Sequence, residues 1–268
     1  MTNMLCLDPN DEIMKLWASG ANSTWIDKKN LNQYDESIPI AFRSMTKRKL
    51  MHSLLKDSKR DFYYIDNGYM GNSMKRKFFY RVVKNDIQHI GRFKELPGDR
   101  WRGQVSLCPW LVYHGKKVTQ SGPILLVTPS GKPCQYYGID RDTWVTETIE
   151  KIRKYTDRPI KIRDKGLRSE RIKDNSIGSQ CAREGIYAVV TYNSIAALEA
   201  VHYGIPAFTM APHAGDVICS TDLSTIDNAK YPDEDLVRSF WNWIAYQQYS
   251  PIELMQGIAL RLQEEHQL

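Results

Sequence analysis

The sequence predicts an α/β protein with two lobes, each built around a parallel sheet. Its 268 residues are enough for two lobes, and 42% of them are apolar while 25% are charged, as in an ordinary globular protein with a core. Short apolar runs alternate with stretches of helical apolar spacing, the order typical of α/β folds. We expect one lobe over residues 1–120, a second over 121–245, and a C-terminal helix within 246–268 that packs back on the lobes.

The first lobe contains a predicted β-α-β unit. Residues 38–43 predict a short strand, residues 44–56 have the apolar spacing of a helix, and residues 61–66 have the aromatic and β-branched content of a buried strand. Residues 80–83 favour another strand. Residues 91–103 are rich in glycine, proline and charge, which favours a loop.

The second lobe has a more regular pattern. Four apolar runs predict strands at residues 123–128, 159–163, 187–191 and 205–209, and helical spacing is found at residues 142–155 and 195–203. Strands that alternate with helices in this way pair in parallel within one sheet. A last amphipathic helix is expected over residues 251–265, with Pro251 near its start.

Several protein classes are excluded by sequence features. No run approaches the roughly 18 apolar residues of a membrane span, and the first residues, MTNMLCLDPNDE, lack the layout of a secretory signal, so we expect a cytoplasmic protein. The five cysteines are scattered, which favours reduced packing residues over disulfides or a zinc site, and we expect no metal. Neither a Walker A motif nor G-x-G-x-x-G is present, which disfavours P-loop ATPases and ordinary NAD dehydrogenases.

Charge is distributed unevenly along the chain. Residues 1–120 contain 21 basic and 12 acidic side chains, whereas residues 121–268 contain 16 and 19. Between residues 43 and 117 the basic side chains are interleaved with aromatic ones, a pattern that suits a polyanion such as double-stranded DNA. A solvated surface over an aromatic core explains the same pattern. The candidate DNA-binding residues are Lys75, Arg76, Lys77 and Arg81.

Small polar and basic residues follow the strands of the second lobe. The carboxyl ends of parallel strands meet at one edge of a sheet, where glycine-containing turns, a helix N-terminus and basic side chains can hold a diphosphate. A carboxylate on the following helix can accept the hydroxyls of a ribose. The candidate donor-binding residues are Ser130, Gly131, Lys132, Arg163, Lys165, Thr191, Asn193, Ser194 and Glu199. Ser194 as a plain helix cap and Glu199 as a solvated residue remain open.

The segment from Thr191 to Ala207, TYNSIAALEAVHYGIPA, resembles the donor-domain segment of GT-B glycosyltransferases, in which a small polar turn opens a helix that G-x-P ends. Residues 60–265 more broadly resemble a family of small, phage-encoded GT-B-like proteins. The segments that carry this resemblance are residues 63–70, 80–85, 156–165 and 247–257. The sequence departs from that family at Asn67, where histidine is expected, and at Tyr249, where tryptophan is expected.

The resemblance implies a fold of two Rossmann-like lobes of GT-B type with an active-site cleft between them. It also implies metal-independent sugar transfer from a nucleotide-diphosphate sugar, with no further cofactor. A phage setting and the basic first half together favour 5-hydroxymethylpyrimidine in DNA as the acceptor, within the host cytoplasm. A polysaccharide or small-molecule acceptor, and a non-catalytic protein that binds nucleotide sugar or nucleic acid, remain alternatives.

Sugar transfer needs a base for the acceptor hydroxyl. Asp66 is the candidate, because it ends an aromatic strand of the first lobe, where a low dielectric would raise its pKa. Alternatively, Asp66 is a turn residue whose side chain forms a hydrogen bond to its own backbone. His213, just after the fourth strand of the second lobe, is the next candidate for contact with sugar or phosphate, although most single histidines of this kind are loop residues. Asp222 is a weaker candidate of the same sort.

Overall fold

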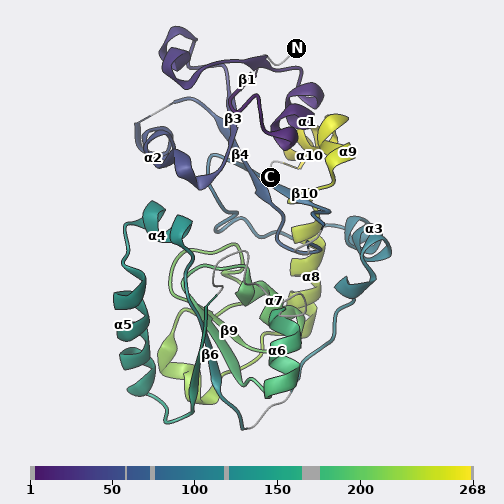
Figure 1. Cartoon of the computed structure of the whole chain (residues 1–268). Coiled ribbons are helices and arrows are strands. Elements are labelled where there is room, and N and C mark those ends of the chain that lie inside the picture. Colours follow the sequence, from purple (N-terminus) through teal and green to yellow (C-terminus); the bar gives the residue numbers. More distant parts are fainter. Residues whose placement is uncertain (1–3, 58, 73–75, 118–120, 165–175, 267–268) are drawn as a thin grey trace. The chain divides into compact units, whose positions relative to one another are not determined.

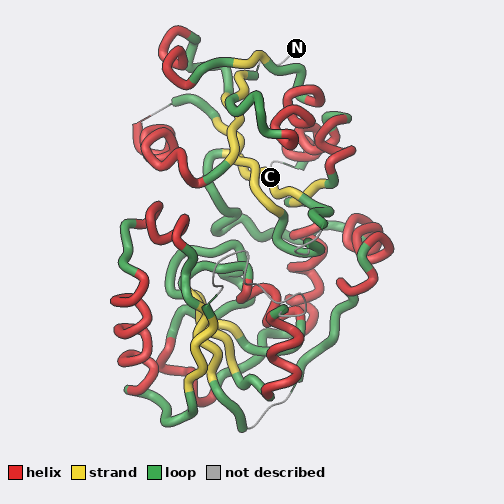
Figure 2. The backbone as a smooth tube through the Cα atoms, viewed as in Figure 1, coloured by secondary structure: helices red, strands yellow, loops and turns green. Residues whose placement is uncertain are grey.

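The computed structural model describes residues 4–57, 59–72, 76–117, 121–164 and 176–266 (Figure 1). The chain divides into two compact units. Unit 1 contains Met1–Arg92, Leu96–Trp110 and Asn242–Leu268, and unit 2 contains Phe93–Glu95 and Leu111–Trp241. Each unit has its own sheet with helices around it (Figure 2).

Unit 1 is built on a six-stranded sheet in the order β10-β5-β4-β3-β1-β2. Strands β2, β1, β3 and β4 pair in parallel, and β5 pairs antiparallel with both β4 and β10. The strands are β1 (Leu5–Cys6), β2 (Thr24–Trp25), β3 (Ile40–Arg43), β4 (Phe62–Asn67), β5 (Tyr80–Lys84) and β10 (Gln248–Tyr249). The helices are α1 (Glu12–Gly20), α2 (Arg48–Asp57), α3 (Asp99–Leu107), α9 (Pro251–Met255) and α10 (Ile258–Glu265).

The predicted β-α-β unit is confirmed: β3, α2 and β4 follow one another, and Ile40 pairs with Phe62 in parallel register. The predicted strand at residues 80–83 is β5. The prediction of a loop over residues 91–103 is wrong at its end, because α3 begins at Asp99. Loop-forming glycine and proline come just before that helix, and Gly98 is its N-cap.

The predicted single helix over residues 251–265 is wrong, because it is interrupted between α9 and α10. Gly257 adopts the left-handed conformation there, with φ of 70°, which glycine reaches without strain. Gly20, at the end of α1, packs against the same break. A Cβ atom on Gly20 would lie 2.0 Å from the carbonyl oxygen of Leu254, so close approach of α1 and α9 requires glycine here.

Unit 2 is built on a four-stranded parallel sheet in the order β7-β6-β8-β9, as the alternation of strands and helices predicts. In Figure 1, α5 lies on one side of this sheet and α6 and α7 lie on the other. The strands are β6 (Ile124–Val127), β7 (Ile160–Arg163), β8 (Ala188–Thr191) and β9 (Ala207–Thr209). The helices are α4 (Gly131–Tyr137), α5 (Arg141–Arg153), α6 (Ile177–Glu184), α7 (Ala196–His202) and α8 (Glu234–Ala245), whose last residues belong to unit 1.

Alternate residues of the unit 2 strands face opposite layers of helix, so both faces are apolar. Ile124, Leu126 and Val190 join Ile152 of α5 in one buried cluster. Across the sheet, Gly178 of α6 lies against the ring of Tyr203, where a Cβ would come within 2.2 Å of the ring.

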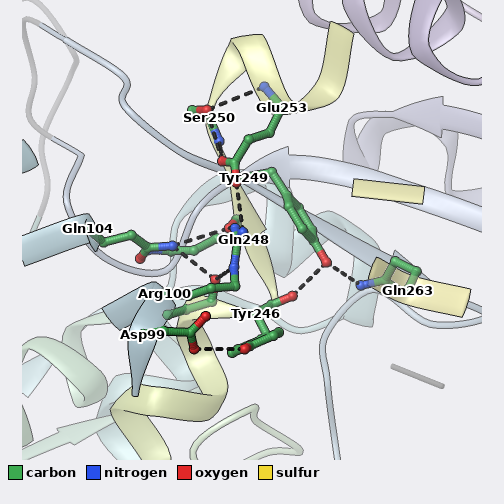
Figure 3. Close-up of polar contacts among 10 residues, drawn as sticks. Asp99, Arg100, Gln104, Tyr246, Gln248, Tyr249, Ser250, Glu253 and Gln263 are labelled. Atoms are coloured by element: carbon green, nitrogen blue, oxygen red, sulfur yellow. Dashed lines mark hydrogen bonds and ion pairs between the residues drawn. The ribbon is translucent and has the colours of Figure 1, made fainter. Parts of the chain in front are cut away.

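Arg100 of α3 ties the C-terminal segment to the rest of unit 1 (Figure 3). Its Nε donates to the carbonyl oxygen of Ala245 (2.9 Å), its Nη2 to that of Gln248 (3.2 Å), and its Nη1 pairs with Glu253 (2.7 Å). Gln104, one turn later on α3, donates to the same Ala245 carbonyl (2.9 Å). These bonds fix β10 beside α3.

Tyr249 connects this arrangement to α10. Its buried hydroxyl donates to the carbonyl oxygen of Tyr246 (2.6 Å) and accepts from Nε2 of Gln263 (3.0 Å), as Figure 3 shows. Burial raises the pKa of this phenol well above its ordinary value, so the hydroxyl stays protonated. The hydroxyl thus both donates and accepts a hydrogen bond, which the N–H group of an indole could not do.

Arg100→Ala should lower the free energy of unfolding by about 3–5 kcal/mol, because the Glu253 carboxylate loses its ion-pair partner and the carbonyl groups of Ala245 and Gln248 each lose one donor. Urea denaturation followed by circular dichroism measures this. Arg102→Ala, which removes an exposed guanidinium from the same helix, is the control and should change stability by about 0.5 kcal/mol or less. Equal losses in the two variants would contradict the role given to Arg100.

Candidate functional site

The carboxyl ends of the unit 2 strands meet at one edge. The parallel register aligns Val127 with both Arg163 and Thr191, and Thr191 with Thr209. Thr191 is fully buried, and its hydroxyl donates to the carbonyl oxygen of Val127 (3.1 Å). The edge expected from the sequence is therefore present, whereas its role in donor binding stays a prediction.

Arg163 and Glu199 lie within electrostatic range of each other at this edge. Arg163 is partly buried, and its Nη1 donates to Oε1 of Gln180 on α6. Burial lowers the pKa of the Arg163 guanidinium, and the charge of Glu199 on α7 opposes that shift. The structure thus brings together a partly desolvated cation and a carboxylate, and partial desolvation strengthens the attraction of a cation for an anionic ligand.

The turn after β8 is shaped by local hydrogen bonds. Asn193 is buried, and the hydroxyl oxygen of Ser194 accepts from the N–H of Ala196 (3.3 Å). The helix begins at Ala196, slightly later than predicted, and ends at His202, two residues before Gly204, whose φ is 82°. Glycine is required at that end, because a Cβ would lie 2.1 Å from a backbone oxygen. Ser194 precedes the N-cap Ile195, so its hydroxyl makes a local hydrogen bond within the turn and is not the cap of the helix.

The remaining donor candidates are exposed or lie outside the described residues. Ser130, Gly131 and Lys132 are exposed at the start of α4, and the Ser130 side chain makes no capping hydrogen bond. Lys165 lies outside the described residues.

Two features of this edge were missed from the sequence. Tyr192 makes edge-to-face contacts with Tyr137 (ring centroids 5.3 Å apart) and with Trp144 (5.9 Å). Arg141, the first residue of α5, pairs with Asp164 directly after β7. For the aromatic cluster, the sequence does show a tyrosine between Thr191 and Asn193. Nothing in the sequence indicates that Tyr137 and Trp144 lie against its ring.

In unit 1, Asp66 sits near the end of β4 with three polar contacts. Its carboxylate accepts from the Tyr64 hydroxyl (2.8 Å) and the Asn67 N–H (2.8 Å), and it pairs with Arg81 (3.4 Å). The Asp66 side chain remains 28% exposed. Burial and the Asp66 charge raise the pKa of Tyr64 well above its ordinary value, so the phenol remains a donor. These contacts orient the carboxylate without removing it from solvent.

The contacts of Asp66 continue into the core through Arg81. Its guanidinium lies over the ring of Tyr69, at 5.1 Å from the centroid, and the Tyr69 hydroxyl bonds Nδ1 of His89 (2.9 Å). His89 Nε2 bonds the carbonyl oxygen of Val82 (3.0 Å). Because a carbonyl only accepts, Nε2 carries the proton and Nδ1 accepts from Tyr69, which is the neutral form of histidine. Burial, together with the charges of Arg92 and Arg81, lowers the pKa of His89 well below its ordinary value.

The other predicted residues have varied surroundings. His213 is buried in the turn after β9, and its Nδ1 accepts from the N–H of Gly215 (3.0 Å). Asp222 caps a 3₁₀ helix. Among the DNA-binding candidates, Lys75 lies outside the described residues, exposed Arg76 stacks on Phe78, Lys77 is partly exposed, and Arg81 is buried in its pair with Asp66.

The fold is similar to that of known sugar transferases. The β-Kdo 2,7-transferase of KpsC from Thermosulfurimonas dismutans aligns with a TM-score of 0.57 and 9% identity over 97% of this chain and 99% of that one. The β-Kdo 2,4-transferase of KpsC from the same organism aligns with a TM-score of 0.56 and 11% identity over 98% of each chain. No family model and no curated protein sequence matches. The chain thus has an α/β fold that is also found in glycosyltransferases.

The described residues contain neither a candidate membrane span nor a cluster of metal ligands. None of their helices combines the length and the apolar character needed to cross a membrane. Within the same part of the chain, no three histidine, cysteine, aspartate or glutamate side chains are grouped as metal ligands would be.

Acid should weaken unit 1 through His89. Below its ordinary pKa of 6.5 the histidine of the unfolded chain takes up a proton, whereas native His89 stays neutral, so stability is lost as pH falls. The loss approaches about 1.4 kcal/mol for each pH unit below that value. His89→Gln removes this component. The difference in unfolding free energy between parent and variant should shrink between about pH 7 and pH 5, and a constant difference would contradict the assignment.

Proposed function

We propose that this protein transfers a sugar from a nucleotide-diphosphate donor to a hydroxyl group of an acceptor. The observation that carries the proposal is the fold alignment with two sugar transferases over nearly the full length of each chain. A metal-independent reaction and the two-lobe arrangement of GT-B enzymes are part of the proposal. We also propose a cytoplasmic setting, which all five cysteines, free in the structure, support.

The donor would bind at the carboxyl edge of the unit 2 sheet. Arg163 supplies a guanidinium that can pair with phosphate oxygens, and the turn at Asn193 and Ser194 follows β8, which is separated from β7 by β6 and ends at the same edge. Glu199 can accept hydroxyl groups of the ribose. Tyr192, within its aromatic cluster, offers apolar surface next to the same turn. When the sugar departs, Arg163 would stabilise the charge that develops on the diphosphate.

Asp66 would act as the general base. Its carboxylate takes the proton of the acceptor hydroxyl while that oxygen forms a bond to the anomeric carbon of the sugar. The bond from the anomeric carbon to the diphosphate oxygen breaks, and the diphosphate leaves with the electron pair. Tyr64 and Arg81 hold the carboxylate in place for this step.

The distribution of charge between the two units bears on which class of acceptor we propose. Counted by structural unit, unit 1 holds 19 basic and 14 acidic residues and unit 2 holds 18 and 17, so much of the asymmetry along the sequence disappears. Arg81 is also used inside the fold. A 5-hydroxymethylpyrimidine in phage DNA therefore keeps support only from the net positive charge of unit 1. We favour a saccharide acceptor, for which a pocket of unit 1 is suited.

Arg163→Ala should weaken donor binding by about 1.5–3 kcal/mol, the contribution of a hydrogen bond to a charged group. Calorimetry with a panel of nucleotide sugars measures this. Lys161→Ala is the matched control, since Lys161 is an exposed cation on the same strand that pairs with Glu184. Unchanged affinity in the Arg163 variant would remove this residue from the donor site.

Asp66→Asn keeps the shape of the side chain and removes its basicity, so turnover should fall by about 10²-fold or more while donor affinity stays constant. The measurement is the rate of sugar transfer, with circular dichroism to verify folding. Asp61→Asn, at a half-exposed carboxylate that precedes the same strand, should transfer sugar at the parent rate. If Asp66→Asn also does so, the base lies elsewhere and His213 is the next residue to change.

A further inference from the structure

A pocket of about 840 Å³ lies at the carboxyl ends of β1, β2 and β3 in unit 1. Its volume falls within the range of about 300–1,000 Å³ that is usual for small-ligand sites. The three strands are parallel, so the residues that follow them converge at one edge, as they do in unit 2. No residue of the predicted acceptor set lines this pocket.

The charged groups of the pocket balance one another. Asp8, Asp11 and Asp27 face Lys28, Arg43 and Lys47, so the formal charges sum to zero. Lys47 pairs with Asp8 at 2.7 Å and Arg43 pairs with Asp11 at 2.9 Å, and all four side chains are mostly buried. A phosphate group would have to compete with these carboxylates for cations that are already neutralised. The pocket therefore disfavours a polyanion.

An aromatic ring completes the pocket. Trp25 of β2 lines it and remains 38% exposed, so a ligand in the pocket can reach its indole. A sugar ring has an apolar face of C–H groups that can cover an indole, and hydroxyl groups around its edge that bond to carboxylates and guanidinium groups. Asp27 accepts from the N–H of Lys29 (2.9 Å), and a carboxylate has about four acceptor positions, so capacity remains for hydroxyl donors.

The pocket is connected to the candidate base. Arg43, which lines the pocket, pairs in register with Ile65, and its Nη2 donates to Oδ1 of Asn67 (3.3 Å), the residue after Asp66. A ligand in contact with Arg43 thus lies at the same strand edge as the carboxylate that would deprotonate it.

We infer that this pocket binds an uncharged sugar residue, with the apolar face of the sugar on Trp25 and its hydroxyl groups on the surrounding aspartates. The inference deepens the proposed function, on which it rests for the statement that this sugar is the acceptor. The binding itself requires no transfer, and the two are tested separately.

The binding test uses the full-length protein labelled with 5-fluorotryptophan. The resonance of Trp25 is assigned by its loss from Trp25→Phe, and methyl glycosides of the common neutral hexoses and pentoses, a short DNA duplex and inorganic phosphate are titrated in turn. We expect at least one glycoside to shift this resonance. Trp25→Ala should weaken glycoside binding, followed through the ligand signals, by about tenfold, or about 1.4 kcal/mol. Trp25→Phe should weaken it less.

Trp110→Ala is the matched control, because Trp110 is also an exposed tryptophan of unit 1 and does not line the pocket. It should bind glycosides as the parent does. The inference is overturned if no glycoside shifts the Trp25 resonance, if DNA or phosphate does so in place of glycosides, or if the two tryptophan variants lose binding equally.

The transfer test separates the inference from the proposed function. With a glycoside that binds, Trp25→Ala should raise the KM for acceptor and leave the KM for donor unchanged. If the protein binds glycosides at Trp25 but transfers no sugar to them from any nucleotide sugar, the pocket stands and the proposed function fails. If transfer occurs and Trp25→Ala leaves the acceptor KM unchanged, the function stands and the pocket assignment fails.

Discussion

In both units, the parallel pairing of strands decides where polar side chains gather. Val127, Arg163 and Thr191 share one edge because their strands run in the same direction and in register. The pocket of unit 1 arises in the same way from β1, β2 and β3. Most of the strands are buried and apolar, so polar groups gather mainly at their last residues and at the residues that follow them. Each unit therefore presents one polar edge on an apolar sheet.

The C-terminal segment supplies β10, at one end of the unit 1 sheet, and helices α9 and α10. Arg100 and Glu253 are 153 residues apart in sequence, and no local sequence pattern predicts their pairing. The capping box at Ser250 and Glu253 orients the same carboxylate toward Arg100, so a helix cap and a long-range ion pair share one side chain. Gly20 has no side chain, so α9 can pack closely against α1. The close packing at Gly20 and the hydrogen bonds of the mostly buried Arg100 guanidinium fix the position of the C-terminal segment. The burial of apolar area alone would not specify how this segment aligns with its neighbours.

Much of the unit 2 fold could be predicted from the sequence, because short, mainly apolar strands of three or four residues separated by helices leave few alternatives. In unit 1 the same reasoning found β3, α2, β4 and β5. It missed β1, β2 and β10, each of two residues, because a pattern of alternation cannot be recognised over so short a length. The pocket was missed for the same reason, since two of its three strands were missed. Asp66 and Arg163 could be named as candidates because each lies at or near the end of a longer strand, and their roles stay predictions.

The charge of the sequence illustrates how a linear window can mislead. Between residues 43 and 117 basic side chains outnumber acidic ones, yet Arg43 and Lys47 pair with Asp11 and Asp8, which precede that window. Arg100 pairs with Glu253, which lies far beyond it. Folding brings acids from both ends of the chain to the basic segment, so some of the cations that suggested a polyanion are neutralised within the fold. What remains at the unit 1 edge is a charge-balanced pocket beside an exposed indole, and such a surface recognises hydroxyl groups and C–H faces better than phosphate.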